Sequence, residues 1–156
     1  MTPHLSKLTI NLFLTALLAI TLSSIWWFTH QTSPQATVKK MFPTLRCDFI
    51  NTPCTVKKKS FEISLEIEST NIISFEPLPF KVTFKGLDAQ DVRLHFQGIE
   101  MFMGPNTLNL KAQTPDIYTG THTLAGHSGY SMTWRAILTF SDQGEPQETW
   151  FEFELK

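Results

Sequence analysis

The hydrophobic residues between positions 60 and 155 repeat with a period of two, and this pattern limits the fold of the 156-residue chain most narrowly. In the segment SFEISLEIE at 60–68, phenylalanine, isoleucine and leucine alternate with serine and glutamate. Successive side chains of a strand point to opposite faces of a sheet, so this segment predicts a strand with one apolar face. Further strands are predicted at 80–84, 92–97, 108–110, 116–124, 132–140 and 151–155.

The spacing of these segments indicates the fold class. Turns containing glycine or proline separate them at intervals of about 8–12 residues, and none carries the apolar stripe of a helix. We therefore expect an all-β domain, an immunoglobulin-like β-sandwich of about seven strands preceded by a single N-terminal transmembrane helix. A closed barrel fits the same spacing. The Cys…Trp…Cys pattern of true immunoglobulin domains is absent, so the expectation concerns architecture alone.

The chain begins with a nearly charge-free segment, in which residues 8–28 are uncharged and Lys7 is the one Lys, Arg, Asp or Glu before position 30. About 20 apolar residues suffice for a helix to cross a hydrocarbon core of about 30 Å. The run ends in Trp26-Trp27-Phe28, which suits a membrane boundary better than a signal-peptidase site. We expect a transmembrane anchor at 8–28, with a cleaved signal peptide as the alternative.

The predicted anchor divides the chain into a cytoplasmic N-terminus at 1–7, a polar linker at 29–45 and a periplasmic domain at 46–156. Lys7 on one side competes with Lys39 and Lys40 on the other, so the positive-inside rule does not settle the orientation. Long folded domains translocate largely regardless of charge. We therefore expect the domain to lie outside the cytoplasm.

The two cysteines support an oxidising compartment. Cys47 and Cys54 flank a short segment in which Asn51 and Pro53 favour a turn. A disulfide between them is the expected state, because secreted domains commonly carry such bridges. A metal-binding or redox-active thiol pair is the alternative, although the spacing differs from Cys-x-x-Cys.

Composition and motifs argue against two classes of function. Of the 13 Lys and Arg residues none forms a basic stripe, and 14 Asp and Glu residues balance them, so nucleic acid is not an expected partner. The chain lacks Gly-x-Ser-x-Gly, His-Glu-x-x-His, Cys-x-x-Cys and a phosphate-binding glycine loop. We therefore do not expect an enzyme.

One short segment carries soft metal donors. Met101 and Met103, two residues apart, project to one side if the chain is extended, and thioethers select Cu(I). His127, in a Gly-His-Ser-Gly loop, is the candidate third ligand. The alternative is that Met101 and Met103 pack in the core, as methionines commonly do, and that His127 is a loop residue without a role in metal binding. Separately, Trp150 on the last predicted strand is a candidate contact for a partner.

The stretch 79–140 contains four short motifs: Met101-Phe-Met-Gly104, Leu108-x-Leu110, Tyr118-Thr-Gly120 and Met132-Thr-Trp134-Arg135. With these motifs the stretch resembles bacterial YtkA/FixH-type domains. The resemblance implies a single-pass protein of the bacterial inner membrane with an immunoglobulin-like domain in the periplasm, in a group linked to respiratory oxidase assembly and copper handling. The Cys47/Cys54 pair departs from that family, as does His127, which stands where a cysteine is expected.

Two functions follow from these expectations. The first is a membrane-anchored periplasmic accessory protein for respiratory oxidase assembly or copper handling, with Cu(I) as its possible cargo at Met101, Met103 and His127. The alternative is a metal-free interaction module that docks a membrane complex.

Overall fold

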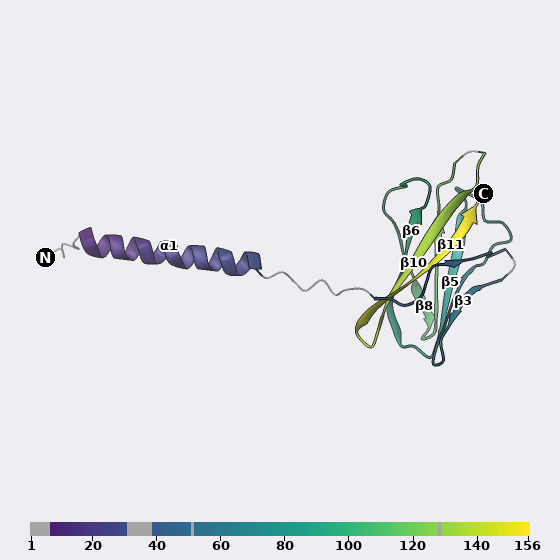
Figure 1. Ribbon diagram of the computed structural model, residues 1–156, viewed down its shortest axis with the longest axis horizontal. Coiled ribbons are helices and arrows are strands. Elements are labelled where there is room, and N and C mark those ends of the chain that lie inside the picture. The colour runs from purple at the N-terminus through teal and green to yellow at the C-terminus, as the bar shows by residue number, and fades with distance from the viewer. Residues whose placement is uncertain (1–6, 31–38, 51, 128) are drawn as a thin grey trace. The chain divides into compact units, whose positions relative to one another are not determined.

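A computed structural model describes residues 7–30, 39–50, 52–127 and 129–156 (Figure 1). The chain forms two compact units, residues 1–36 with the helix α1 (Lys7–His30) and residues 37–156 with the strands. Most of the expected cytoplasmic segment 1–7, residues 31–38 of the expected linker, and Asn51 lie outside the described residues.

Helix α1 is long and apolar enough to cross a membrane. Its 24 residues extend for about 36 Å at 1.5 Å per residue, and the window Ile10–Trp27 has a mean hydropathy of 1.7. The hydroxyls of Thr21 and Ser24 each donate to a carbonyl three residues earlier, both at 2.9 Å. These bonds satisfy polar groups that lipid could not. A signal sequence near an N-terminus meets the same criteria of length and composition.

The strands form two separate antiparallel-rich sheets, which confirms the predicted sandwich in place of a closed barrel. Sheet A has the order β1-β11-β10-β6-β7, and β2 also pairs with β11. Its strands are β1 (Lys39–Lys40), β2 (Leu45–Arg46), β6 (Ala89–Gly98), β7 (Asn106–Asn109), β10 (Met132–Asp142) and β11 (Glu145–Leu155). Sheet B has the order β3-β4-β5-β9-β8. Its strands are β3 (Cys54–Lys57), β4 (Glu62–Ile67), β5 (Pro77–Lys85), β8 (Lys111–Thr114) and β9 (Ile117–Thr123).

The core lies between the sheets and is rich in aromatic residues. Alternate residues of β4, β5, β6 and β10 are buried, as the period of two requires. Ring pairs join the two sheets: Phe80 lies 4.9 Å from Phe96, and Phe84 lies 4.9 Å from Phe140. Trp134 on β10 is fully buried and belongs to the same core cluster. These aromatic contacts help to fix the position of one sheet against the other.

Strand order gives the sandwich two unlike ends. We call the end that carries the loops 48–53, 68–76, 99–105 and 124–131 the loop end, which is the end marked C in Figure 1. The opposite end carries the tight connections 58–61, 86–88, 115–116 and 143–144, and we call it the turn end. At the loop end, Ser74 N donates to the Lys156 carbonyl at 2.7 Å, and Phe75 N donates to the Leu124 carbonyl at 2.8 Å. The first bond ties the end of β11 in sheet A to the loop 68–76 of sheet B, and the second ties that loop to the end of β9 in the same sheet.

Part of the segment expected to be a linker, residues 29–45, belongs to sheet A. Strands β1 and β2 pair in parallel with β11, at Lys39↔Gln147 and Leu45↔Phe151. The chain therefore joins the sandwich at the turn end and runs along β11 towards the loop end. Two-residue strands have no periodicity of their own, and the pairing with β11 alone defines them.

Candidate functional site

Exposed apolar side chains gather at the loop end. In the described part of the sandwich, the large apolar residues exposed to solvent are Ile50, Ile73, Phe75, Ile99, Met101, Phe102 and Tyr130. All of them lie on the four loops of this end. The three aromatic side chains are the most exposed, at 87% for Phe102, 74% for Tyr130 and 66% for Phe75. A concentration of apolar groups at one end is typical of an interaction surface.

The loop 99–105 is fixed to the sheet below it. Ile99 N donates to the Thr133 carbonyl at 2.9 Å, and Thr133 N donates to Glu100 Oε2 at 3.0 Å. The bond from Thr133 lowers the pKa of the Glu100 carboxyl, because it stabilises the charged form. These two hydrogen bonds fix the backbone of the loop that carries the exposed Phe102.

The loops 68–76 and 124–131 touch through Gly126. A Cβ atom at this position would lie 2.3 Å from the Cβ atom of Ser74, so the close approach requires glycine. Beyond it, the rings of His127 and Tyr130 lie 5.6 Å apart. Two connections far apart in the sequence therefore form one surface.

The structure places the two candidate methionine ligands in different surroundings. The sequence predicts an extended chain at this point. The chain instead bends after Gly98, so that a Cβ atom on Gly98 would lie 2.4 Å from the Met101 carbonyl oxygen. Met101 is exposed, whereas Met103 is half-buried and packs against the core. The expectation of one shared side rested on an extended chain, which the loop after Gly98 does not form, and a joint role of the two methionines stays a prediction. Met103 serves at least partly as packing.

His127 lies on another loop of the same end and is exposed. Among the described residues, no three His, Cys, Asp or Glu side chains come close enough to hold a metal ion. A Cu(I) site here would therefore depend on thioethers, with Met101 as the accessible one. His122, another possible donor, is engaged elsewhere: Nε2 lies 2.9 Å from Asn106 Oδ1, and the ring stacks on Phe96 at 5.4 Å.

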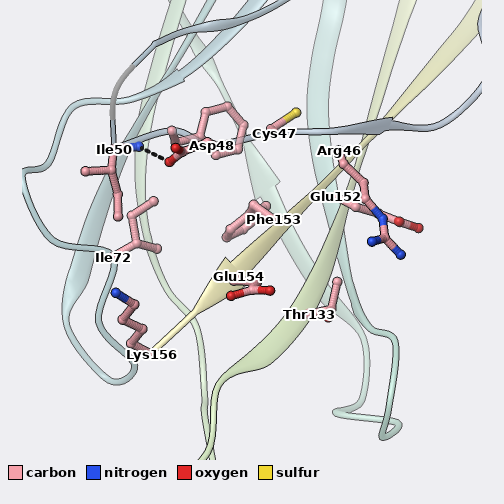
Figure 2. Close-up of a pocket in the computed structure, with 11 residues that line it drawn as sticks. Arg46, Cys47, Asp48, Ile50, Ile72, Thr133, Glu152, Phe153, Glu154 and Lys156 are labelled. Atoms are coloured by element: carbon pink, nitrogen blue, oxygen red, sulfur yellow. Dashed lines mark hydrogen bonds between the residues drawn. The ribbon is translucent and has the colours of Figure 1, made fainter.

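Cys47 and Cys54 form the predicted disulfide, with Cα atoms 5.5 Å apart. The bridge closes the loop 48–53 at the point where the chain crosses from sheet A to sheet B. Beside it lies a hollow of about 400 Å³ lined in part by Phe153 and Ile72 (Figure 2). Its charged lining consists of Arg46, Asp48, Glu152, Glu154 and Lys156. Both signs of charge are present, so the hollow favours no single ligand charge.

Trp150, the candidate partner contact, has neighbours within the sandwich. It is half-buried, with Lys40 Nζ 3.4 Å and Arg135 Cζ 4.8 Å from the ring. Its Nε1 donates to Glu148 Oε1 at 3.1 Å. Both cations stabilise the ring where it stands. A contact between Trp150 and a partner remains a prediction.

The aromatic residues of the loop end escaped the sequence reasoning. Phe75, Phe102 and Tyr130 lie between the predicted strands, where an apolar side chain has no core position to fill. An exposed aromatic residue in a predicted loop was the signal that could have identified this surface. Their gathering at one end depends on strand order, which the sequence did not provide.

No protein-family model matches this chain, and no curated protein matches it. Among solved structures, a DUF4785 family protein from Legionella pneumophila aligns with 64% of the chain at 16% identity and a TM-score of 0.46. An engineered protein aligns with 59% of the chain at 16% identity and a TM-score of 0.44. The matched regions cover 29% and 20% of those proteins, so the chain spans less than a third of either. Similarities this distant imply no shared activity.

Proposed function

We propose that this protein is a membrane-anchored accessory module that docks a membrane protein complex through the loop end of its sandwich. Helix α1 is retained as the anchor, and the sandwich lies on the periplasmic side of the bacterial inner membrane. The observation that carries the proposal is the concentration of exposed apolar side chains on four loops of one end. The proposal includes no catalytic activity.

Three aromatic residues are suited to be the main contacts. Full burial of a large apolar side chain is worth about 1.5–3 kcal/mol, and Phe75, Phe102 and Tyr130 are each mostly exposed in the isolated chain. Their loops are held by backbone bonds, so docking would order little additional chain. Attachment to the same membrane also raises the effective concentration of a membrane partner.

The partner class follows from two lines of support. Exposed carboxylates (Glu76, Glu100 and Glu154) and exposed cations (Arg46 and Lys156) both border the apolar side chains, so they favour a partner with a polar rim of mixed charge. The resemblance of residues 79–140 to YtkA/FixH-type domains directs the proposal to a respiratory oxidase or its assembly intermediate.

Co-purification from native membranes tests the proposal. We expect the full chain, extracted in mild detergent, to retain one stoichiometric membrane complex. The triple variant Phe75→Ser, Phe102→Ser, Tyr130→Ser should lose it. A control variant with Leu87→Ser, Pro115→Ser and Gln143→Ser, at the turn end, should keep it. Equal recovery with both variants would contradict the docking surface, whereas release of the chain by alkaline carbonate would contradict the anchor.

Copper handling is a second candidate function, favoured by the exposure of Met101 at the same end as His127. In this proposal Met101, Met103 and His127 hold Cu(I) for delivery to the docked complex. Titration of the full chain with Cu(I) under reducing conditions tests it. The affinity should fall in Met101→Leu with Met103→Leu, and an unchanged affinity would show that these ligands are wrong.

A further inference from the structure

We propose that the outer face of sheet A binds a neutral saccharide in an open hollow beside the loop 99–105. The outer face is the side of the sheet turned away from sheet B and the core, and we call the site the sheet A hollow. Its volume is about 430 Å³, within the range of about 300–1,000 Å³ that is typical of small-molecule sites. This inference goes beyond the proposed function and needs neither the anchor nor the docked partner.

Three neighbouring strands build the floor of the sheet A hollow. His95 on β6 pairs with Ile137 on β10 and, on its other side, with Thr107 on β7. Neighbouring strands lie about 4.8 Å apart, so these side chains form a continuous row. Gln97 and Thr139 lie two residues further along β6 and β10, and they therefore share the same face. All five side chains line the hollow.

The loop 99–105 forms one wall of the hollow and supplies an aromatic ring. Phe102 and Pro105 line this wall, and Phe102 is 87% exposed, so a ligand can reach its ring. The two hydrogen bonds to Thr133 hold the loop against the sheet. The wall is therefore in place before a ligand binds, which lowers the cost of binding.

The polar groups of the floor are uncharged and can both donate and accept hydrogen bonds. They are one amide, two hydroxyls and one imidazole, carried by Gln97, Thr107, Thr139 and His95. His95 Nδ1 lies 2.9 Å from Thr107 Oγ1, so Nε2 is the ring nitrogen that a ligand can reach. Burial, together with the charge of Arg93, lowers the pKa of His95, and the imidazole is therefore neutral at neutral pH.

The charges around the sheet A hollow cancel. Three carboxylates and three cations line it, lie on its loop or occupy neighbouring positions on the strands: Glu100, Glu148, Glu152, Lys40, Arg93 and Arg135. Arg135 is paired with Glu152, and Lys40 Nζ lies 3.4 Å from the Trp150 ring centroid. The one carboxylate in the lining, Glu148, accepts a hydrogen bond from Trp150 Nε1. A charged ligand would therefore gain no net attraction here.

This combination of groups matches the chemistry of a sugar ring. A sugar ring has an apolar face of C–H groups and a rim of hydroxyls that both donate and accept hydrogen bonds. The C–H face fits against the Phe102 ring, because the face of an aromatic ring is electron-rich. The hydroxyls fit against the neutral groups of the floor. An ion would lack a counter-charge, and an acyl chain would leave the polar floor unpaired, which is costly.

Saturation-transfer NMR on the full chain tests the inference. The chain is held in phosphatidylcholine nanodiscs, because many mild detergents are themselves glycosides. The probes are chitotriose, cellotriose and maltotriose. We expect at least one of them to bind with a Kd of about 1 mM or lower. The absence of saturation transfer to all three at about 10 mM would overturn the proposal.

Variants locate the site. Gln97→Ala with Thr139→Ala should weaken binding about tenfold, because two hydrogen bonds are lost. The matched control on sheet B, Thr83→Ala with Gln113→Ala, should bind as the wild-type chain does. Phe102→Ala should also weaken binding about tenfold and Phe102→Trp should retain it, because the aromatic ring is present again. Phe102 is mostly exposed, so neither change disturbs folding. An unchanged affinity in Gln97→Ala with Thr139→Ala would show that the site is wrong.

Two loop-end substitutions separate this site from the docking surface. Phe75→Ser with Tyr130→Ser removes two aromatic side chains that do not line the sheet A hollow. This variant should lose the partner complex and bind the trisaccharide with the wild-type affinity. A loss of trisaccharide binding in this variant would contradict the sheet A site, whereas retention of the complex would bear on the docking surface alone.

Discussion

Replacement of Thr149 by valine should stabilise the sandwich, because this threonine buries a hydroxyl without compensation. Thr149 lies on β11 opposite Leu138 and is completely buried. Within the described residues its hydroxyl has no hydrogen-bond partner. Valine has nearly the same shape and the same preference for strands. The substitution therefore changes the polarity of the site and little else.

The magnitude follows from the cost of an unpaired buried hydroxyl. Leaving such a group unsatisfied costs about 1–3 kcal/mol, and the added methyl group gains up to about 0.8 kcal/mol on burial. Since the surrounding aromatic core must accommodate a slightly larger group, we expect a net gain of about 1–2 kcal/mol. Urea unfolding of the full chain in detergent, followed by the fluorescence of buried Trp134, measures it.

A control on the neighbouring strand separates this effect from strand propensity. Thr139 is half-buried on β10 and pairs with Glu148 of β11. Thr139→Val should change the free energy of unfolding by no more than about 0.5 kcal/mol. A destabilised Thr149→Val protein would refute the reasoning, because it would show that the hydroxyl has a partner such as a buried water.

Three further predictions concern the loop end and its support. Replacing Cys47 and Cys54 by serine should cost about 2.5 kcal/mol in urea unfolding, from the entropy of the eight-residue loop that their separation of 7 defines; an unchanged midpoint would contradict it. Gly126→Ala should cost about 1–3 kcal/mol and weaken recovery of the partner complex, because the new methyl group meets Ser74. Burial lowers the pKa of His122 from its usual value of 6.5, so the unfolded chain binds more protons and stability should fall as the pH drops below that value. His122→Gln should lessen this fall in thermal unfolding measured between neutral pH and pH ~5.

The sequence predicts the central strands well because their periodicity is local. Four predicted segments correspond to β4, β5, β6 and β10: 60–68, 80–84, 92–97 and 132–140. Alternate side chains of these strands are buried, so the sequence itself shows a hydrophobic period of two. The disulfide was also predictable, since two cysteines in a short segment have one intramolecular pairing.

Features that depend on distant partners were not predictable in this way. The strands β1 and β2 are defined by their pairing with β11, and the loop after Gly98 is bonded through Glu100 to Thr133, more than thirty residues away. The loop end is likewise a product of strand order. Met101, Phe102 and Tyr130 look unrelated in the sequence until the sheets bring their loops to one end.

Site-specific photocrosslinking in native membranes tests the docking surface most directly. A photoreactive residue is placed singly at Phe75, Phe102 or Tyr130, and for comparison at the turn-end positions 87, 115 and 143. We expect the three loop-end positions to yield one adduct of the same mass, containing a membrane protein of the respiratory chain, and the turn-end positions to yield none with that protein. Adducts with lipid at Phe102, or the same protein adduct from the turn end, would contradict the account.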